Sequence, residues 1–402
     1  MPKYMPKYLL KGGKIATSVK GNDGVQTFYG DLLVEGTTMT KIEAVIDCTD
    51  KWITPGFIDT HRYLMTEYMI KMPWTVQPDI TPDEVRIGTL AGCLDPLHNG
   101  VTTLLDHFQA TMSPAHFDAA LAASAPTRLY PAMEFGDDAA ARARRLDRIT
   151  RLGRETGGSL RADGRVTLGL AYDALISGAG GEAGAEAHRG FVVSAHALAD
   201  AHITTWRDVG LLGPDLVFGH CNNLQGRPEA GDEVWKLLKE SGAGIGATPL
   251  GELGTAQGYP VALEGTEHGV KCGLVVLQWQ RRMHHADVRA NKSPAPYKNK
   301  YNAGDVFRLG NLGGAEVLNM ENIIGTIEVG KRADLIVFNA NSPNLCGVEE
   351  PVVGAVFYAS SEDVEMVLVR GEIVKKCGKL RWPEDRLEGE WKKWWDTNGP
   401  PF

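Results

Sequence analysis

The sequence has few cysteines: six among 402 residues, with no two spaced as C-x-x-C. This scarcity excludes a disulfide framework, so we expect reduced thiols. Basic residues are outnumbered, since 42 Lys and Arg against 50 Asp and Glu give a net charge of -8. That balance argues against nucleic acid or an anionic membrane as a partner. Because membrane-spanning apolar runs and a signal-peptide pattern are also missing, we expect a cytoplasmic protein with a small-molecule substrate.

Strand-like and helix-like segments alternate between residues 55 and 321. This alternation is typical of parallel strands enclosed by helices, as in a (β/α) barrel. Residues 1–54 and 322–402 instead contain short alternating strands separated by turns. Since 402 residues exceed the usual size of one domain, we predict an α/β protein with two units.

One stretch carries the most information about function, residues 52–64 with the sequence WITPGFIDTHRYL. An apolar run that contains Pro-Gly and ends in polar residues predicts a turn followed by a buried strand. The polar residues then lie at the carboxyl end of that strand. Four further motifs are GVTTLLDH at 100–107, GLLGPDLVFGHCNNL at 210–224, TPLGELGTAQGYP at 248–260 and IGTIEVGKRADLIVF at 324–338.

These motifs resemble the amidohydrolase superfamily, in particular its cytosine-deaminase and triazine-chlorohydrolase branch, over about residues 8 to 375. The resemblance implies a distorted (β/α)8 TIM barrel over residues 55–321. It also implies a small β-sandwich formed by residues 1–54 and 322–402. In that branch one zinc or iron ion is held by His-x-His after strand one, single histidines after strands five and six, and an aspartate after strand eight. His61 and His220 match the first ligand and the strand-six ligand.

The other three ligand positions do not match the family pattern. Tyr63 stands at the second histidine, and a phenol with a pKa near 10 is a poor zinc ligand at neutral pH. Our alignment places Trp206 at the strand-five ligand and Leu277 at the aspartate, with His202 as an alternative after a register shift. Two imidazoles fall short of the three protein ligands typical of catalytic zinc. We therefore expect no cofactor, with zinc on His61 and His220 as the alternative.

Without a metal-activated water, the site is left with general acid–base catalysis. We expect a non-hydrolytic lyase, isomerase or cyclase that acts on a small cyclic or aromatic metabolite. His61 and His220 would exchange protons, because an ordinary histidine pKa is near 6.5. Tyr63 would donate to a developing oxyanion or fill the space of the metal. His107 ends a strand on the same face and contacts substrate, or else satisfies a buried hydrogen bond.

Six more side chains are candidate substrate contacts. They follow strand ends, lie in the 248–260 motif or wall an apolar pocket: Glu134, Asp173, Glu252, Gln257, Trp74 and Trp206. Two other functions stay open. One is a zinc-dependent hydrolase or deaminase of C–N bonds with a reduced ligand set, and the other is an inactive binding protein on the same fold. The resemblance also leaves a homodimer open.

Overall fold

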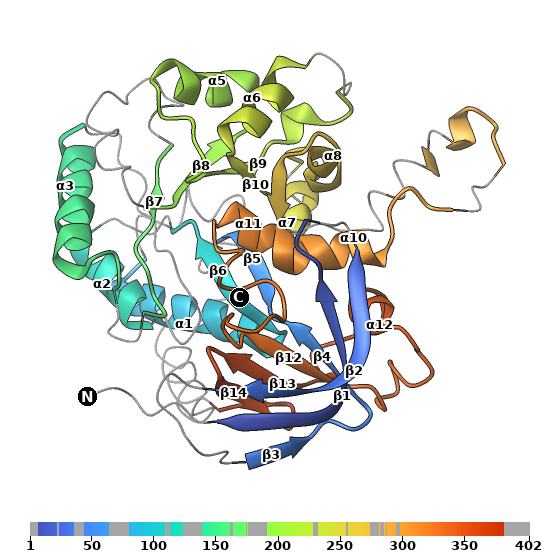
Figure 1. The fold of residues 1–402 in the computed structure, drawn as a ribbon. Coiled ribbons are helices and arrows are strands. Elements are labelled where there is room, and N and C mark those ends of the chain that lie inside the picture. The colour runs from blue at the N-terminus through green and yellow to red at the C-terminus, as the bar shows by residue number, and fades with distance from the viewer. Residues whose placement is uncertain are drawn as a thin grey trace, which may run out of the picture.

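The structure is a computed structural model, drawn in Figure 1. It describes residues 7–21, 24–35, 44–63, 80–108, 113–123, 139–160, 164–173, 175, 191–227, 232–254, 256–273, 281, 285–286, 288–294 and 298–381. In the helix over residues 139–156, side chains are described only from residue 147 onward.

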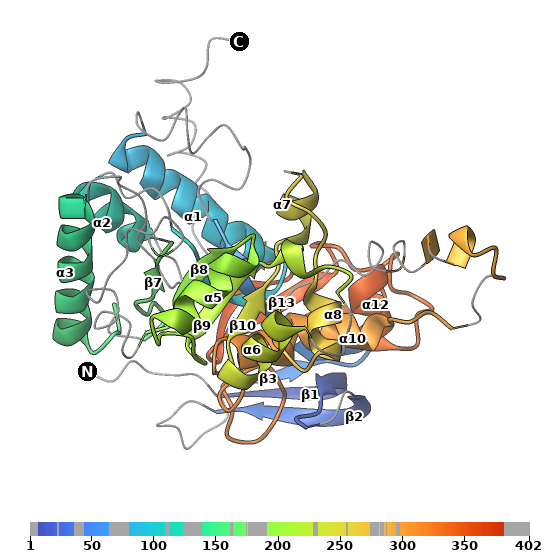
Figure 2. The ribbon, with the colours of Figure 1, turned by 90° about the horizontal axis from the view of Figure 1, so that it is seen from above.

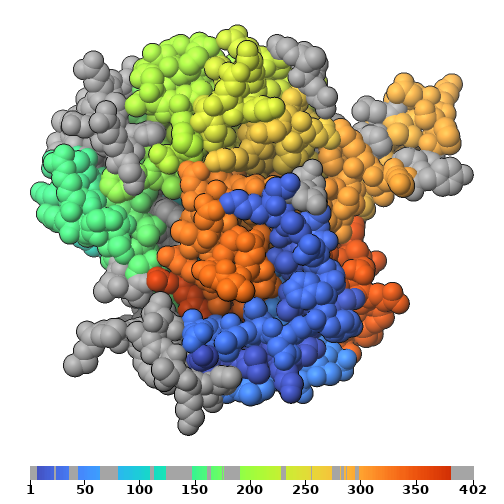
Figure 3. Space-filling model, in the orientation of Figure 1, coloured from blue at the N-terminus to red at the C-terminus, as the bar shows by residue number. Residues whose placement is uncertain are grey.

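The two ends of the chain share one eight-stranded sheet. Its strands are β1 (Tyr8–Ser18), β2 (Val25–Val34), β3 (Ala44–Asp47), β4 (Lys51–Pro55), β12 (Leu335–Asn339), β13 (Val364–Val369), β14 (Glu372–Lys376) and β15 (Lys379–Leu380). The order is β15-β14-β13-β12-β4-β1-β2, with β3 paired to β1. Antiparallel pairing of β4 with β12 joins the two ends. In the space-filling view the blue N-terminal strands lie directly against the orange segment near residue 310 (Figure 3), where Ser18 Oγ bonds Asn311 Oδ1.

Two parallel sheets make up the central part of the chain. One pairs β5 (Phe57–Arg62) with β6 (Val101–Asp106). The other has the order β11-β10-β9-β8-β7, and its strands are β7 (Leu170–Ala171), β8 (Val193–Ala197), β9 (Leu216–His220), β10 (Gly244–Gly246) and β11 (Lys271–Gly273). Because all these pairs are parallel, the carboxyl ends within each sheet meet at one edge.

Helices separate most of the parallel strands, as parallel pairing requires. They are α1 (Pro82–His98), α2 (Pro114–Ala123), α3 (Ala139–Thr156), α5 (Asp200–Asp208), α6 (Glu233–Ser241), α7 (Pro249–Gly254), α8 (Ala262–Glu267), α10 (Ala303–Arg308), α11 (Gly314–Val317) and α12 (Pro351–Phe357), with short turns η3 (Asn222–Leu224) and η4 (Leu309–Gly313). Seen from above, α2 and α3 lie at one side of the molecule and α10 and α12 at the other (Figure 2). Among the described helices, none has the length and apolar character needed to cross a membrane.

The fold is therefore α/β, as the alternating pattern predicted. Helix α1 begins at a local sequence signal for a helix start, a capping box formed by Thr81 and Glu84 with Pro82 at the first helical position. The described strands form a two-stranded and a five-stranded parallel sheet and do not close into one hydrogen-bonded ring. The two sheets nevertheless approach each other closely, because a Cβ atom on Gly273 would lie 2.5 Å from Thr60 Oγ1 of β5.

Candidate metal centre

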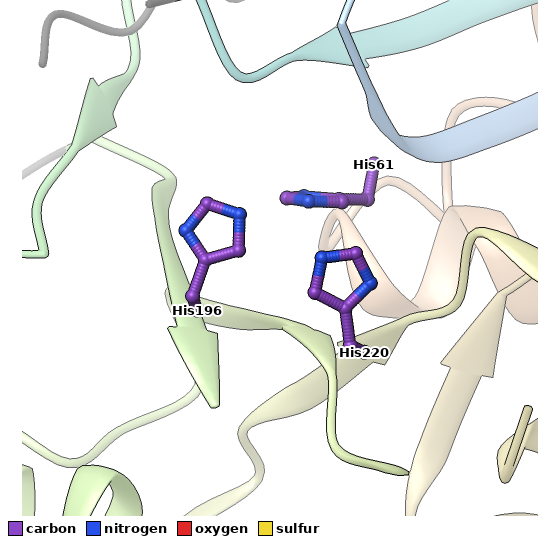
Figure 4. Close-up of side chains that lie close together, drawn as sticks. All are labelled: His61, His196 and His220. Atoms are coloured by element: carbon purple, nitrogen blue, oxygen red, sulfur yellow. The ribbon is translucent and has the colours of Figure 1, made fainter. Parts of the chain in front are cut away.

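Three histidines from three strands converge at the carboxyl edge of the parallel sheets. His61 lies on β5, His196 on β8 and His220 at the end of β9 (Figure 4). One potential ligand atom of each lies within 4.8 Å of those of the other two. Their ring centroids are 5.1 to 5.3 Å apart. His61 and His220 are only 1% and 3% exposed, so a buried cluster of imidazoles lies where the parallel strands end.

A carboxylate orients the ring of His196. Its Nδ1 contacts Asp173 Oδ2, and its backbone N–H donates to Asp173 Oδ1 at 2.7 Å. Since the carboxylate accepts, the proton of the ring lies on Nδ1 and Nε2 keeps its lone pair. A histidine that donates one ring N–H to a carboxylate while the other nitrogen faces outward is the arrangement found at metal sites.

His220 is held in the same way by the 248–252 segment. Its Nδ1 lies 3.2 Å from Glu252 Oε1 and 3.0 Å from Thr248 Oγ1. Glu252 is fully buried and also accepts the backbone N–H of Thr248 at 2.7 Å. His61 has a weaker support, with Nδ1 3.4 Å from Ser194 Oγ. Each of the three rings is thus oriented through Nδ1, which leaves Nε2 for a shared ligand.

Burial favours the neutral form of His61, His220 and His107. Desolvation lowers the pKa of His61 well below its ordinary value, and the neighbouring rings of His220 and His196 lower that pKa further. Desolvation also lowers the pKa of His220, against the opposing effect of its hydrogen bond to Glu252. It lowers the pKa of His107 to about 3. Because only the neutral imidazole binds a metal, His61 and His220 are in the binding form at neutral pH.

The backbone around His220 is shaped to admit the His61 ring. His220 and Cys221 have φ angles of 74° and 55°, a left-handed conformation that residues with a Cβ rarely adopt. Such conformations concentrate at functional sites. A Cβ atom added to Gly219 would lie 2.7 Å from His61 Nε2, and one added to Gly246 would lie 2.8 Å from His61 Cβ. The two glycines therefore create the space that the His61 side chain occupies.

These residues fit a zinc ion. Three neutral imidazoles equal the number of protein ligands in typical catalytic zinc sites, and each has an oriented Nδ1. A second group of three, His107, Asp173 and His196, shares one histidine with the first. We treat it as support for His196, because its carboxylate already binds His196 Nδ1.

Replacing Asp173 by asparagine should weaken zinc binding about 10- to 100-fold, because the carboxylate that orients and polarises His196 is lost. Competition titration of the chelated protein with a coloured chelator measures the dissociation constant. Asp200→Asn is the matched control: Asp200 lies on α5 and pairs with Arg227, so this substitution should leave the zinc affinity within about twofold. Unchanged affinity in Asp173→Asn would mean that Asp173 does not support the metal site.

The other predicted site residues have mixed positions. Tyr63 and His107 lie beside the cluster, with ring centroids 5.9 and 4.5 Å from that of His196. Trp206 lies on α5, is 1% exposed in the hydrophobic core and packs against Tyr172 and Phe218. Gln257 is exposed, and its backbone N–H donates to the Glu252 carbonyl at 3.1 Å. Trp74 and Glu134 fall outside the described residues, as does Leu277.

His196 was missed from the sequence, and the alignment that put Trp206 at the strand-five position is wrong. The signal was present: residues 192–196 read VVSAH, a short apolar run ending in histidine, as in LVFGH at 216–220. His202, the alternative ligand, lies on α5 and accepts the backbone N–H of Leu198 on Nδ1 at 3.1 Å. The count of two histidine ligands therefore rises to three.

Comparison with known proteins gives a consistent result. The amidohydrolase family model matches residues 52–374. The chain is 24% identical to a 5-methylthioadenosine/S-adenosylhomocysteine deaminase of Desulforudis audaxviator, over 89% of this chain and 91% of the relative. It is 22% identical to a 5'-deoxyadenosine deaminase of Methanobrevibacter smithii, over 85% of each.

Solved structures share the fold. An adenosine deaminase from Xanthomonas campestris with bound zinc superposes with a TM-score of 0.72 at 17% identity, covering 98% of both chains. Atrazine chlorohydrolase from Arthrobacter aurescens TC1 complexed with zinc gives 0.76 at 16% identity, covering 96% of this chain and 99% of the other.

These findings overturn two expectations from the sequence. A non-hydrolytic lyase or isomerase disagrees with relatives that are named as deaminases and with structural neighbours named as a deaminase and a hydrolase. A metal-free site disagrees with the three-histidine cluster and with the zinc in the related structures. The match of the family model to most of the sequence shows that the chain belongs to the amidohydrolase family.

Proposed function

We propose that the protein is a zinc-dependent hydrolase of C–N bonds that deaminates a small amino-substituted heterocycle. The observation that carries the proposal is the cluster of His61, His196 and His220, whose ligand atoms lie within 4.8 Å of one another. When bound there, zinc lowers the pKa of its water to about 7 and so supplies hydroxide at neutral pH. The names of the relatives support an adenine nucleoside derivative as the substrate.

The chain's own residues would orient the site and move the proton. Hydrolytic deamination replaces the bond between a ring carbon and its exocyclic amino nitrogen by a C–O bond, and one proton passes from the attacking water to the departing amine, which leaves as ammonia. We assign this transfer to His107, whose Nε2 lies 3.9 Å from Oδ2 of Asp173, the carboxylate that orients His196. His107 Nδ1 is fixed 2.9 Å from Ser194 Oγ, so its other nitrogen stays directed toward Asp173. Glu252 acts through His220 as a positioning residue.

Removal of the metal tests this function directly. Dialysis against a chelator should lower the rate of ammonia release by about 10³-fold or more, because the activated water is worth several kcal/mol. The substrates assayed are 5'-methylthioadenosine, S-adenosylhomocysteine and 5'-deoxyadenosine. Zinc added back should restore the rate, while a mock-dialysed sample keeps it throughout. Full activity in protein shown by elemental analysis to be free of metal would exclude the proposal.

We also infer that the two parallel sheets are arcs of one distorted (β/α)8 barrel over residues 55–321. The close approach of Gly246 and Gly273 to Thr60 of β5 supports this, because it places β5 beside β10 and β11. The eight-stranded sheet would then belong to the second unit, from residues 1–54 and 322–402. A crystal structure in which β5 lies away from β11 would contradict this arrangement. The six free cysteines support a cytoplasmic location, which cell fractionation would test.

A further inference from the structure

We propose that Tyr63 is a fourth protein ligand of the metal, bound through its phenolate oxygen. This inference rests on the proposed function, since it needs the same ion. Tyr63 follows His61 by two residues, and residues two apart in an extended chain point to the same side. Its Oη lies 3.1 Å from His61 Nε2 and contacts His196 Nε2. The hydroxyl is therefore directed at the two nitrogens that face the metal position.

The distance between Tyr63 Oη and His61 Nε2 suits coordination. In a five-coordinate site, which leaves one position for the water beside four protein ligands, metal–ligand bonds of about 2.0 Å put neighbouring donor atoms about 2.8 to 3.5 Å apart. The 3.1 Å between Tyr63 Oη and His61 Nε2 lies within that range. The phenol ring lies nearly parallel to the ring of His196, with an interplanar angle of 6° and centroids 5.9 Å apart, and makes edge contacts with His61 and His107. A residue that only filled space would not need a hydroxyl at this point.

The hydrogen bonds of these atoms are compatible with a cation between them. His196 donates from Nδ1 to Asp173, so its Nε2 carries a lone pair. When His61 carries its proton on Nδ1, which faces Ser194 Oγ, its Nε2 also has a lone pair. In that tautomer the single phenol proton satisfies only one of the two nitrogens, whereas a metal ion satisfies both nitrogens and the oxygen.

A phenolate would also supply a negative charge, which the three described imidazoles lack. The family aspartate gives the metal one negative charge, and our alignment has Leu277 at that position. Three imidazoles with one phenolate restore the same total. Phenol is intrinsically more acidic than water, so an ion that ionises its bound water near pH 7 also ionises a coordinated phenol. The low acidity of a free phenol, which argued against Tyr63 as a ligand, therefore does not apply to the bound form.

The test uses copper, because a phenolate bound to Cu²⁺ gives a charge-transfer band in visible light and an imidazole does not. The chelated full-length protein is titrated with Cu²⁺ while absorption and bound metal are followed. The unchanged protein should bind about one ion per chain and develop the band. Tyr63→Phe should bind copper about 10-fold or more weakly and lose the band. Tyr63→His, which restores His-x-His, should keep the metal and also lose the band.

The controls separate this inference from the proposed function. Tyr29→Phe, at an exposed position on β2, should leave both the band and the copper affinity unchanged. About one bound ion per chain without a visible band in the unchanged protein, or a band that persists in Tyr63→Phe, would overturn the role of Tyr63 alone. Failure of the unchanged protein to bind any metal would overturn the proposed function, and this inference with it.

Discussion

Replacing His196 by alanine is expected to remove the bound metal and lower kcat/KM for deamination by about 10³-fold or more. The substitution deletes one of three imidazoles whose ligand atoms lie within 4.8 Å of one another. It also leaves the Asp173 carboxylate without the ring that it holds. Loss of an activated water is worth several kcal/mol, and each 1.4 kcal/mol is about tenfold in rate. Elemental analysis of the purified variant and an ammonia-release assay measure the two effects.

His202→Ala is the matched control for this prediction. His202 lies on α5, six residues after His196, and its Nδ1 accepts the backbone N–H of Leu198. The variant should keep about one metal ion per chain and lose less than about threefold in kcat/KM, since a substitution outside the functional features usually has a small effect. If His196→Ala kept its metal while His202→Ala lost it, the assignment of the strand-five ligand would be wrong.

Replacing Gly219 by alanine should lower kcat/KM by about 100-fold, because it displaces His61. The new Cβ would stand 2.7 Å from both Nε2 and Cε1 of that ring, closer than side-chain atoms pack. A displacement of about 1 Å at a catalytic group can cost about 100-fold in rate. The variant should also bind zinc more weakly, which a chelator-competition titration measures, while circular dichroism confirms that it is folded.

Gly213→Ala provides the control for added volume. No atom lies within 4 Å of a Cβ at this position, and its backbone conformation is one that alanine adopts. It should keep the zinc affinity and activity of the unchanged protein. Equal activities for Gly219→Ala and Gly213→Ala would show that the His61 ring does not depend on the gap at Gly219.

The sequence predicted those parts of the fold whose patterns are local and strong. The PGFIDTH motif lies on β4 and β5, and LVFGH forms β9. Pairing of β4 with β12 joins residues almost 300 positions apart, and such contacts follow from the family resemblance and not from local periodicity.

The error at strand five has a physical cause. The alignment to the family pattern placed the strand-five ligand just before the strand-six motif, at Trp206, but Ile203 and Trp206 bury one face of helix α5 at a spacing of three residues. The true strand, Val193–Ala197, contains small and polar residues, so its apolar signal is weak. Missing that strand removed His196 from the ligand count, and the metal-free prediction followed from the shortfall.

Several of the side chains predicted for the site nevertheless lie together, because polar residues at the ends of parallel strands converge. His61, Tyr63, His107 and His220 lie together, and Asp173 and Glu252 bind Nδ1 atoms of cluster histidines. What the sequence could not supply was the orientation of each ring. That orientation depends on hydrogen bonds between segments far apart in the chain, such as the bond from His220 to Glu252.

The most direct test of the metal centre is an anomalous difference map, measured at the zinc absorption edge from crystals of the full-length protein. The proposal predicts a single strong peak about 2.0–2.1 Å from one imidazole nitrogen each of His61, His196 and His220. A map without a peak between these rings, from crystals whose dissolved protein deaminates at the full rate, would contradict it.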